Sequence, residues 1–516
     1  MGAGSPNCIL VLMADQLAAR WLPIHGHRLV QTPHLSELAR TATVFERAYS
    51  AYPLCAPSRA AMLTGRLASA VGVYDNAAEL PASVPTAVHA LRDAGYYTAV
   101  AGKMHFVGPD QLHGFEERLT TDIYPADVDW TPDWNRSLDQ LLPWYHTMES
   151  VLNPGVCAAS MQTDYDEEVA FHAVRKLVDI ARQRPQQPFL LFVSFTNPHD
   201  PWEIPARHWD RYRAEEIDDP VVSAMPLDQA DPHSRRLRAM CRVDQAGLSA
   251  EQIRRARHGY YAAVSYLDER VGQVLGALRM TGLEDRTTVV FTADHGEMLG
   301  ERGLWYKMSF LEHSAHVPLI VRRPGDVTQR RVAEPVSLID VAPTLLELAD
   351  VPNLPEAVQA MDGTSLAAAI LCGRPAPDHP VLSEYHAEGV QAPSAMIVRG
   401  RHKLIVSGQD PEMLFDLDAD PRELHDLAGD PDHRPTISAL RAQLSARLDL
   451  DQIDRRVRAS QRERQLVSRA LRRGRYTSWD YQPHVDAAMQ YVRSREDLYE
   501  LQRQARLETG GSERRG

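Results

Sequence analysis

Cysteine and long apolar runs are both scarce in this sequence. Its five cysteines are spread over 516 residues, are odd in number and form no Cys-x-x-Cys pair. That distribution argues against a disulfide framework and a structural zinc site, and it fits a reducing compartment. No stretch approaches the roughly 20 apolar residues that a membrane-spanning helix needs. We therefore expect neither a disulfide-stapled secreted protein nor a membrane protein.

Basic residues are also fewer than acidic ones. The 69 acidic and 56 basic residues give a net charge of −13, which would repel nucleic acid and anionic membrane surfaces. Residues 1–7 lack the basic segment and apolar run of a signal peptide. We therefore expect a cytoplasmic protein without a nucleic-acid or membrane partner, in which anion-binding charge is confined to a site.

Short apolar runs that end in polar residues are the main architectural signal. Such runs lie at 8–13, 95–101, 189–195 and 287–292, and they are typical of strands buried on both faces of a parallel sheet. The polar residues that follow them are Asp15, Lys103, His105, His199, Asp294 and His295. Because open α/β sheets bind ligands at the carboxyl ends of their strands, we expect these side chains to gather at one edge.

Helical patterns separate these strands. They cover 34–41, 86–93, 165–184, 264–278 and 337–346, and a further strand is expected at 318–322. Residues 120–160 are rich in Trp, Tyr, Pro and Asp but show no clear period. We expect a long functional loop there.

The chain is long enough for one large domain with a smaller companion. The proline-rich piece 373–380 indicates a connection, so we expect a main domain over 1–375, a subdomain over 376–450 and an extension over 451–516. The subdomain should hold an antiparallel sheet of strands 395–398, 403–406 and 413–416, with a packing helix over 433–450. In the helical extension, Trp479 and Tyr481 predict packing on the main domain or on another subunit, with disorder only from Glu508 onward.

The stretch from Leu54 to Arg66 has the strongest chemical character. It places Cys55, Pro57, Ser58 and Arg59 within five residues and continues into an Ala/Leu-rich helix. A nucleophile at a helix N-terminus faces unpaired N–H groups and the positive end of the dipole, which suits an anionic substrate. A lone Cys-x-Pro is more often a buried structural cysteine beside a turn, but the flanking residues favour a catalytic site.

This Cys-x-Pro-Ser-Arg element, followed by Thr64-Gly65-Arg66, resembles the signature of the type I sulfatases. The resemblance implies an α/β fold with an alkaline-phosphatase/sulfatase-like mixed sheet flanked by helices. It also implies that a formylglycine-generating enzyme oxidises Cys55 to formylglycine after translation. The expected activity is hydrolysis of a small sulfate ester.

The same resemblance implies a divalent metal ion. Its ligands would be Asp15, Asp294, His295 and the oxygen that Cys55 gains, an oxygen-rich set that suits Ca²⁺ or Mn²⁺ better than zinc. The family often has two adjacent Asp and an Asp-Asn pair at these positions, whereas this chain has Gln16 and His295. These departures resemble the branch of choline sulfatases and phosphonate monoester hydrolases. They leave the identity of the metal ion undetermined, and Gln16 is expected to be a weak ligand or none.

The remaining catalytic roles are implied in the same way. Arg59 would orient and stabilise the formylglycine, while Lys103 and Lys307 would hold the sulfate oxygens. A hydroxyl of the hydrated aldehyde would attack sulfur, and His199 would protonate the departing alcohol. His105 would then take the proton of the second hydroxyl as the aldehyde reforms.

The resemblance narrows over 73–79, 101–134 and the motif Trp479–Pro483, which are similar to bacterial choline sulfatases. It implies choline-O-sulfate as substrate and, from the tail, a homo-oligomer (dimer or tetramer). A trimethylammonium group is bound by aromatic faces with a carboxylate nearby. The residues expected to bind it are Trp130, His146 and Glu384, with Tyr145 or Trp144 as further candidates.

Three alternatives remain at this point. A phosphonate or phosphate ester hydrolase of the same superfamily would use the same aldehyde and metal but need no ammonium site. A binding protein would keep Cys55 as a thiol. A zinc phosphatase of the alkaline phosphatase type would have Ser or Thr at position 55 and more His ligands, which the sequence disfavours.

Overall fold

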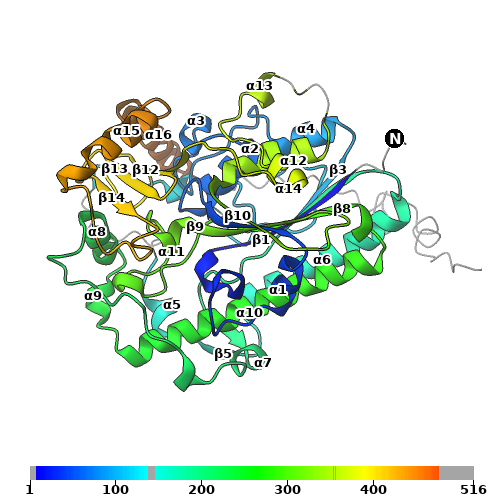
Figure 1. The fold of residues 1–516 in the computed structure, drawn as a ribbon, viewed down its shortest axis with the longest axis horizontal. Helices are drawn as coiled ribbons and strands as arrows, with labels where there is room; N and C mark the ends of the chain where they lie inside the picture. The colour runs from blue at the N-terminus through cyan, green and yellow to red at the C-terminus, as the bar shows by residue number, and fades with distance from the viewer. Residues whose placement is uncertain (1–6, 125, 137–145, 352–353, 355, 476–516) are drawn as a thin grey trace, which may run out of the picture.

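An eight-stranded mixed sheet forms the centre of the molecule (Figure 1). The computed structural model describes residues 7–124, 126–136, 146–351, 354 and 356–475. The strand order is β10-β2-β9-β8-β1-β6-β3-β4. The strands are β1 (Cys8–Ala14), β2 (Thr43–Tyr49), β3 (Tyr97–Gly102), β4 (Glu117–Arg118), β6 (Phe189–Ser194), β8 (Thr287–Ala293), β9 (His316–Arg322) and β10 (Arg330–Ser337).

The register of the central strands brings their carboxyl ends to one level. Strand β1 pairs in parallel with β6 and β8, so Met13 lies opposite Ser194 on one side and Thr292 on the other. Strand β3 extends the parallel set, with Gly102 opposite Ser194. The predicted gathering of strand-end residues at one edge is therefore confirmed for these four strands.

Helices cover both faces of the sheet, as expected for this α/β class. In Figure 1, α2 (Cys55–Thr64), α4 (Ala87–Asp93), α12 (Val341–Leu348) and α14 (Ala367–Cys372) lie on one side. On the other side lie α1 (Pro33–Ala39), α6 (Met161–Gln183) and α10 (Ala250–Met280). Helix α10 begins fourteen residues before the predicted apolar stripe, because Ser249 and Gln252 form a capping box there.

A second, antiparallel sheet packs beside α15 (Arg434–Ser445) and α16 (Leu450–Leu471). Its strands are β11 (Val381–Tyr385), β12 (Ser394–Arg399), β13 (His402–Ser407) and β14 (Met413–Asp416). The three predicted strands are confirmed, whereas β11 was not predicted. The predicted helix over 433–450 ends at Ser445, because Asp449 caps a new helix, α16.

Strands β2 and β10 were also not predicted. Both lie at the far end of the main sheet and carry charged residues such as Glu46 and Arg331, so they lack the continuous apolar run of a doubly buried strand. The tail motif at 479–483 lies outside the described residues.

Short elements complete the fold. They are α3 (Ala68–Val71), α5 (Glu149–Leu152), β5 (Gly155–Cys157), β7 (Glu203–Pro205), α7 (Ala206–Trp209), α8 (Pro232–Met240), α9 (Val243–Ala246), α11 (Glu312–Ala315), α13 (Glu356–Gln359) and the 3-10 turn η3 (Val128–Trp130), among other 3-10 turns. Within 120–160 the described residues form only η3, α5 and β5, in keeping with the predicted loop. Among the described helices, none combines the length and apolar character needed to span a bilayer.

Candidate active site

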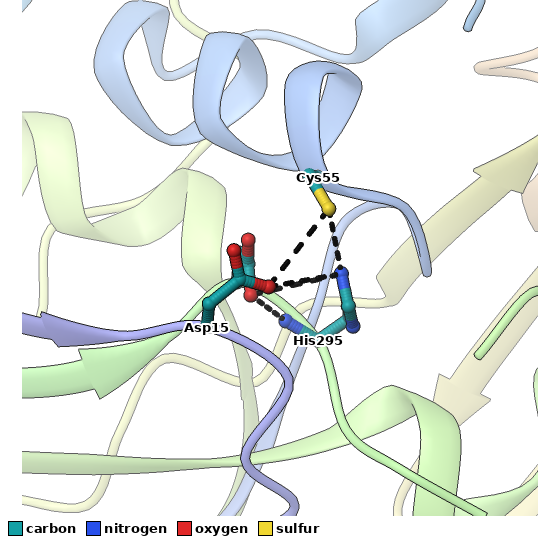
Figure 2. A group of neighbouring side chains, drawn as sticks. Asp15, Cys55 and His295 are labelled. Carbon is teal, nitrogen blue, oxygen red and sulfur yellow. Dashed lines mark hydrogen bonds and ion pairs between the residues drawn. The ribbon is translucent and has the colours of Figure 1, made fainter. Parts of the chain in front are cut away.

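Cys55 is the first residue of helix α2, and Figure 2 shows its sulfur directed at Asp15 and His295. The preceding Leu54 offers no side-chain cap. Instead, Asn76 Oδ1 accepts a hydrogen bond from the Ala56 backbone N–H at 3.0 Å. The predicted placement of a nucleophile at a helix start is therefore present, with a cap supplied by a distant loop.

The four residues predicted to bind the metal lie together. Asp15 follows β1, and Asp294 and His295 follow β8. Cys55 Sγ lies 3.2 Å from His295 Nε2 and 3.9 Å from Asp15 Oδ1. One ligand atom from each of the four residues lies within 4.8 Å of the others, and all four are buried. Two carboxylates and one imidazole fit a hard divalent cation.

Arg59 and Lys103 complete what we call the catalytic cluster (Asp15, Cys55, Arg59, Lys103, Asp294 and His295). Arg59 Nε donates to Asp294 Oδ2 at 2.8 Å, and Nη2 lies 3.4 Å from Asp15 Oδ2. Lys103 pairs with Asp15, and its Nζ lies 3.5 Å from Cys55 Sγ. Because both cations are fully buried, their charge acts on the site with little screening by water.

The cations control the charge state of position 55. Burial alone would raise the pKa of the Cys55 thiol, but Lys103, Lys307 and His295 outweigh burial and hold that pKa well below its usual value. The site therefore stabilises negative charge at this position. It supplies the local positive charge that the acidic chain as a whole lacks.

Gln16, one of the two residues expected to depart from the family pattern, forms hydrogen bonds with its neighbours. Its Oε1 accepts a hydrogen bond from Lys307 Nζ at 2.5 Å, and its Nε2 donates to Glu297 Oε2 at 2.5 Å and to Asp200 Oδ1 at 3.3 Å. Its backbone N–H donates to Asp294. Gln16 thus links the metal-ligand group to Lys307.

His199 and Lys307 form a pair beside the cluster. Lys307 Nζ lies 2.9 Å from His199 Nε2, while His199 Nδ1 lies 2.7 Å from the Asp200 carbonyl oxygen and 3.4 Å from Tyr124 Oη. Burial lowers the pKa of His199 to about 3, and the Lys307 charge acts in the same direction. His199 is therefore neutral near pH 7, and Lys307 donates the proton shared between them.

His105 lies on the other side of the cluster, after β3. It adopts a left-handed backbone conformation with φ of 57°, held by Asp122 Oδ2, which accepts from the backbone N–H groups of Met104 at 2.9 Å and of His105 at 2.7 Å. The His105 side chain lies close enough to Cys55 to be among the groups that lower the pKa of that thiol. The imidazole therefore lies within reach of position 55.

Two expected substrate-binding residues border the catalytic groups. The half-buried Trp130 meets the His105 ring edge-on at a centroid distance of 6.0 Å. His146 stacks on Tyr306 at 4.3 Å, and its Nδ1 lies 3.8 Å from Asp200 Oδ2. Tyr145 and Trp144 lie outside the described residues.

The predicted carboxylate, Glu384, has hydrogen-bond partners outside the catalytic cluster. Its Oε2 accepts from the Ser69 backbone N–H at 3.0 Å, and its Oε1 lies 3.3 Å from His386 Nε2. Glu388, four residues later, is buried, and its Oε2 has no hydrogen-bond partner among the described residues. Burial raises the pKa of Glu388 to about 7. The charge of Cys55 acts in the same direction, whereas that of Lys307 lowers the pKa. We call Trp130, His146 and Glu388 the recognition set.

Sequence reasoning missed the buried carboxylates that hold the catalytic loops. Asp166 on α6 accepts the backbone N–H groups of Thr196 at 2.7 Å and Asn197 at 3.0 Å, just before His199. Glu297 accepts those of Leu299 at 2.8 Å and Tyr306 at 2.7 Å, just before Lys307. No local signal marked them, because an acidic residue on a helix or in a loop more often faces solvent.

A nucleophile at a helix start, an oxygen-rich ligand group and buried cations at the carboxyl edge of an α/β sheet define a hydrolase of anionic esters. The chain belongs to the sulfatase family, whose family model matches residues 6–351. The model of the N-sulphoglucosamine sulphohydrolase C-terminal region matches 300–449, and that of the choline sulfatase C-terminal region matches 455–507. The protein is a sulfuric ester hydrolase.

Known proteins support this assignment. The chain is 45% identical to a choline-sulfatase of Rhizobium meliloti, over 99% of this chain and 100% of the relative. An arylsulfatase of Clostridium perfringens is 27% identical over 86% of this chain and 94% of the relative. The structure of a phosphonate monoester hydrolase of Agrobacterium radiobacter aligns with a TM-score of 0.68 at 23% identity, covering 88% of this chain and 96% of that one. The alkaline-phosphatase/sulfatase-like fold is confirmed.

Proposed function

We propose that the protein hydrolyses choline-O-sulfate to choline and inorganic sulfate. The observation that carries the proposal is the recognition set: Trp130 lies against His105, the His146 ring lies 5.7 Å from that of His199, and the buried Glu388 feels the charges of Lys307 and Cys55. The relative named choline-sulfatase and the matching C-terminal family model support the same substrate.

Two groups supply chemistry that the unmodified side chains lack. Oxidised to formylglycine by a formylglycine-generating enzyme, Cys55 supplies a hydrated aldehyde as nucleophile. Asp15, Asp294, His295 and position 55 would hold a divalent cation, Ca²⁺ or Mn²⁺, which would lower the pKa of that nucleophile and offset the sulfate charge. The metal assignment follows the donor chemistry of the cluster, and the formylglycine assignment follows from the sulfatase family.

The remaining residues bind the sulfate and move protons. Lys103 and Lys307 place positive charge where the sulfate oxygens become more negative in the transition state. Lys307 and His199 share a proton at 2.9 Å, and this pair protonates the departing alcohol oxygen. His105 takes up a proton when the aldehyde is regenerated.

The recognition set binds the trimethylammonium end. Trp130 and His146 offer ring faces and edges to a cation that cannot donate hydrogen bonds, and Glu388 supplies the opposing charge. With a pKa of about 7, Glu388 is partly protonated in the free protein. A bound cation favours its ionised form, so binding of the ester and ionisation of Glu388 support each other.

We further propose a cytoplasmic homo-oligomer (dimer or tetramer), with a catalytic domain over 1–375, a subdomain over 376–450 and a C-terminal extension over 451–516. The match of the choline sulfatase C-terminal model to 455–507 supports a separate C-terminal extension in this part of the chain.

The deciding experiment is sulfate release from choline-O-sulfate by purified protein, with formylglycine at position 55 verified by mass spectrometry. An aryl sulfate and a phosphonate monoester serve as competing substrates, because the alternative function is phosphonate or phosphate ester hydrolysis on the same fold. The proposal expects a clear preference for choline-O-sulfate. Equal or better turnover of the phosphonate ester would reject choline-O-sulfate as the substrate.

A further inference from the structure

Helix α16 lies against the loop that carries Trp130. On the helix, Gln461 Oε1 accepts a hydrogen bond from the Trp134 backbone N–H at 3.1 Å, and Ser468 Oγ donates to Asp129 Oδ1 at 2.5 Å. These contacts flank Trp130 on both sides. A spacing of seven residues puts both helix residues on one face of α16. The loop is therefore attached to the helix before and after its aromatic residue.

Arg464, on the same face, joins this helix to Asp75 and Thr131. Its Nη1 donates to Asp75 Oδ1 at 2.6 Å and its Nη2 to Asp75 Oδ2 at 2.7 Å, a bidentate ion pair. Nη1 also lies 3.3 Å from Thr131 Oγ1, next to Trp130. The Asp75 side chain is fully buried and that of Arg464 is only 12% exposed, so little solvent screens the pair.

Asp75 lies between α16 and the reacting groups. The next residue, Asn76, caps helix α2 at Ala56, beside Cys55. The Asp75 carboxylate is also close enough to Glu388 to raise the pKa of that residue. The position of the Arg464 guanidinium therefore affects Trp130 through the neighbouring Thr131, and the surroundings of Glu388 through Asp75.

We propose that Arg464 is a positioning residue for recognition of the substrate's cationic end. By holding Asp75 and Thr131 at once, it fixes the loop of Trp130 relative to Glu388, so that a trimethylammonium group fits between ring and carboxylate. Arg464 itself touches neither the substrate nor the reacting atoms. This inference rests on the proposed function and extends it to residues of the C-terminal helix.

The test compares Arg464→Lys with the matched control Arg462→Ala, an exposed arginine on the same helix. Lysine keeps the positive charge next to Asp75 but cannot form two parallel hydrogen bonds. Each variant is assayed on choline-O-sulfate and on a neutral isostere with a tert-butyl group in place of the trimethylammonium. We expect KM for choline-O-sulfate to rise about tenfold in Arg464→Lys, with kcat and the isostere's kcat/KM changed less than about twofold. Arg462→Ala should match the wild type.

A second variant, Gln461→Leu, removes the acceptor for the Trp134 N–H at similar volume. It should reproduce the selective rise in KM, and amide hydrogen exchange in 128–134 should be faster in both variants than in the control. Equal losses on both esters, or variants that match Arg462→Ala, would overturn the inference. Failure of the proposed function would instead appear in the wild type, as equal turnover of the two esters.

Discussion

The catalytic cluster and the recognition set are built in different ways. Residues of the cluster follow strands β1, β3 and β8 or begin helix α2, and the buried ion pairs of Arg59 hold Asp15 and Asp294 in place. Members of the recognition set lie in irregular segments: Trp130 in η3, and His146 and Glu388 outside helices and strands. The cluster is positioned by the sheet, whereas the recognition set is positioned by contacts with other segments.

Under the proposed function, this difference would separate the chemical step from substrate selectivity. A site at strand ends can be shared by enzymes that act on different esters, because one fold can carry different functions. Loops and the C-terminal helix α16 can then determine which alcohol the sulfate ester must contain to be bound. Changes in the cluster should therefore affect every substrate, while changes in the recognition set should affect only the cationic one.

The largest effect is expected from Cys55→Ala, which removes the nucleophile from the cluster. We expect kcat to fall at least about a thousandfold on choline-O-sulfate, the neutral isostere and an aryl sulfate alike. Steady-state sulfate release checks this result, with circular dichroism to verify that the variant is folded. A loss confined to one ester would show that the cluster itself selects the alcohol.

The next effect concerns a buried ion pair that joins the second sheet to the main domain. Lys403 Nζ on β13 lies 2.7 Å from Glu312 Oε1 and 2.7 Å from Glu423 Oε1. Lys403→Met removes the cation that the two buried carboxylates share, so we expect the free energy of unfolding at neutral pH to drop by about 3 kcal/mol. Denaturant titration measures the change. The exposed pair of Arg40 and Glu37 provides the control, and Arg40→Ala should cost less than about 0.5 kcal/mol.

Acid should reduce this difference. Burial alone raises the pKa of Glu312, but Lys403, His316 and Arg20 together outweigh burial and hold that pKa well below its usual value. A carboxyl whose pKa is lower in the folded state stabilises the protein above its unfolded pKa of about 4.3, and this contribution is lost as pH falls below that value. If the difference in free energy of unfolding between wild type and Lys403→Met grew larger in acid, this explanation would be contradicted.

Trp130→Ala tests the recognition set. Loss of a ring facing the cation should raise KM for choline-O-sulfate about tenfold to thirtyfold. The neutral isostere should lose much less, because only the charged group is drawn to the ring electrostatically. Parallel losses on the two esters would mean that Trp130 supports His105 rather than the ammonium group.

The smallest effect is expected at Asn76, which lies between the catalytic cluster and the recognition set. Asn76→Ala removes the side-chain cap of helix α2, and we expect a loss of about 1 kcal/mol in the free energy of unfolding. Asn76→Asp keeps an acceptor for the Ala56 N–H and should retain most of the stability. Thermal unfolding of the two variants in parallel distinguishes loss of the cap from a general change in the loop.

Sequence patterns predicted the cluster better than the recognition set. Asp15, Lys103 and Asp294 were placed correctly because a parallel sheet brings successive strand ends to one edge, whatever the chain does in between. Glu388 was not singled out over Glu384, since only side-chain partners distinguish the two.

The tertiary contacts were beyond the reach of sequence patterns. Arg464 pairs with Asp75 across 389 residues, and neither residue stood out by type or spacing. Strands β2 and β10 were missed for a related reason, because their charged residues mask a pairing that depends on neighbouring strands.

The most direct test of this division is the ratio of kcat/KM for choline-O-sulfate to kcat/KM for its neutral isostere, measured from about pH 6 to pH 8 in wild type and Glu388→Gln. Because the pKa of Glu388 is about 7, the wild-type ratio should rise with pH as the carboxylate ionises, from a value already above one. In Glu388→Gln, the ratio should be at least about tenfold lower and independent of pH. A wild-type ratio near one, or a ratio that Glu388→Gln leaves unchanged, would contradict recognition of the cation by this carboxylate.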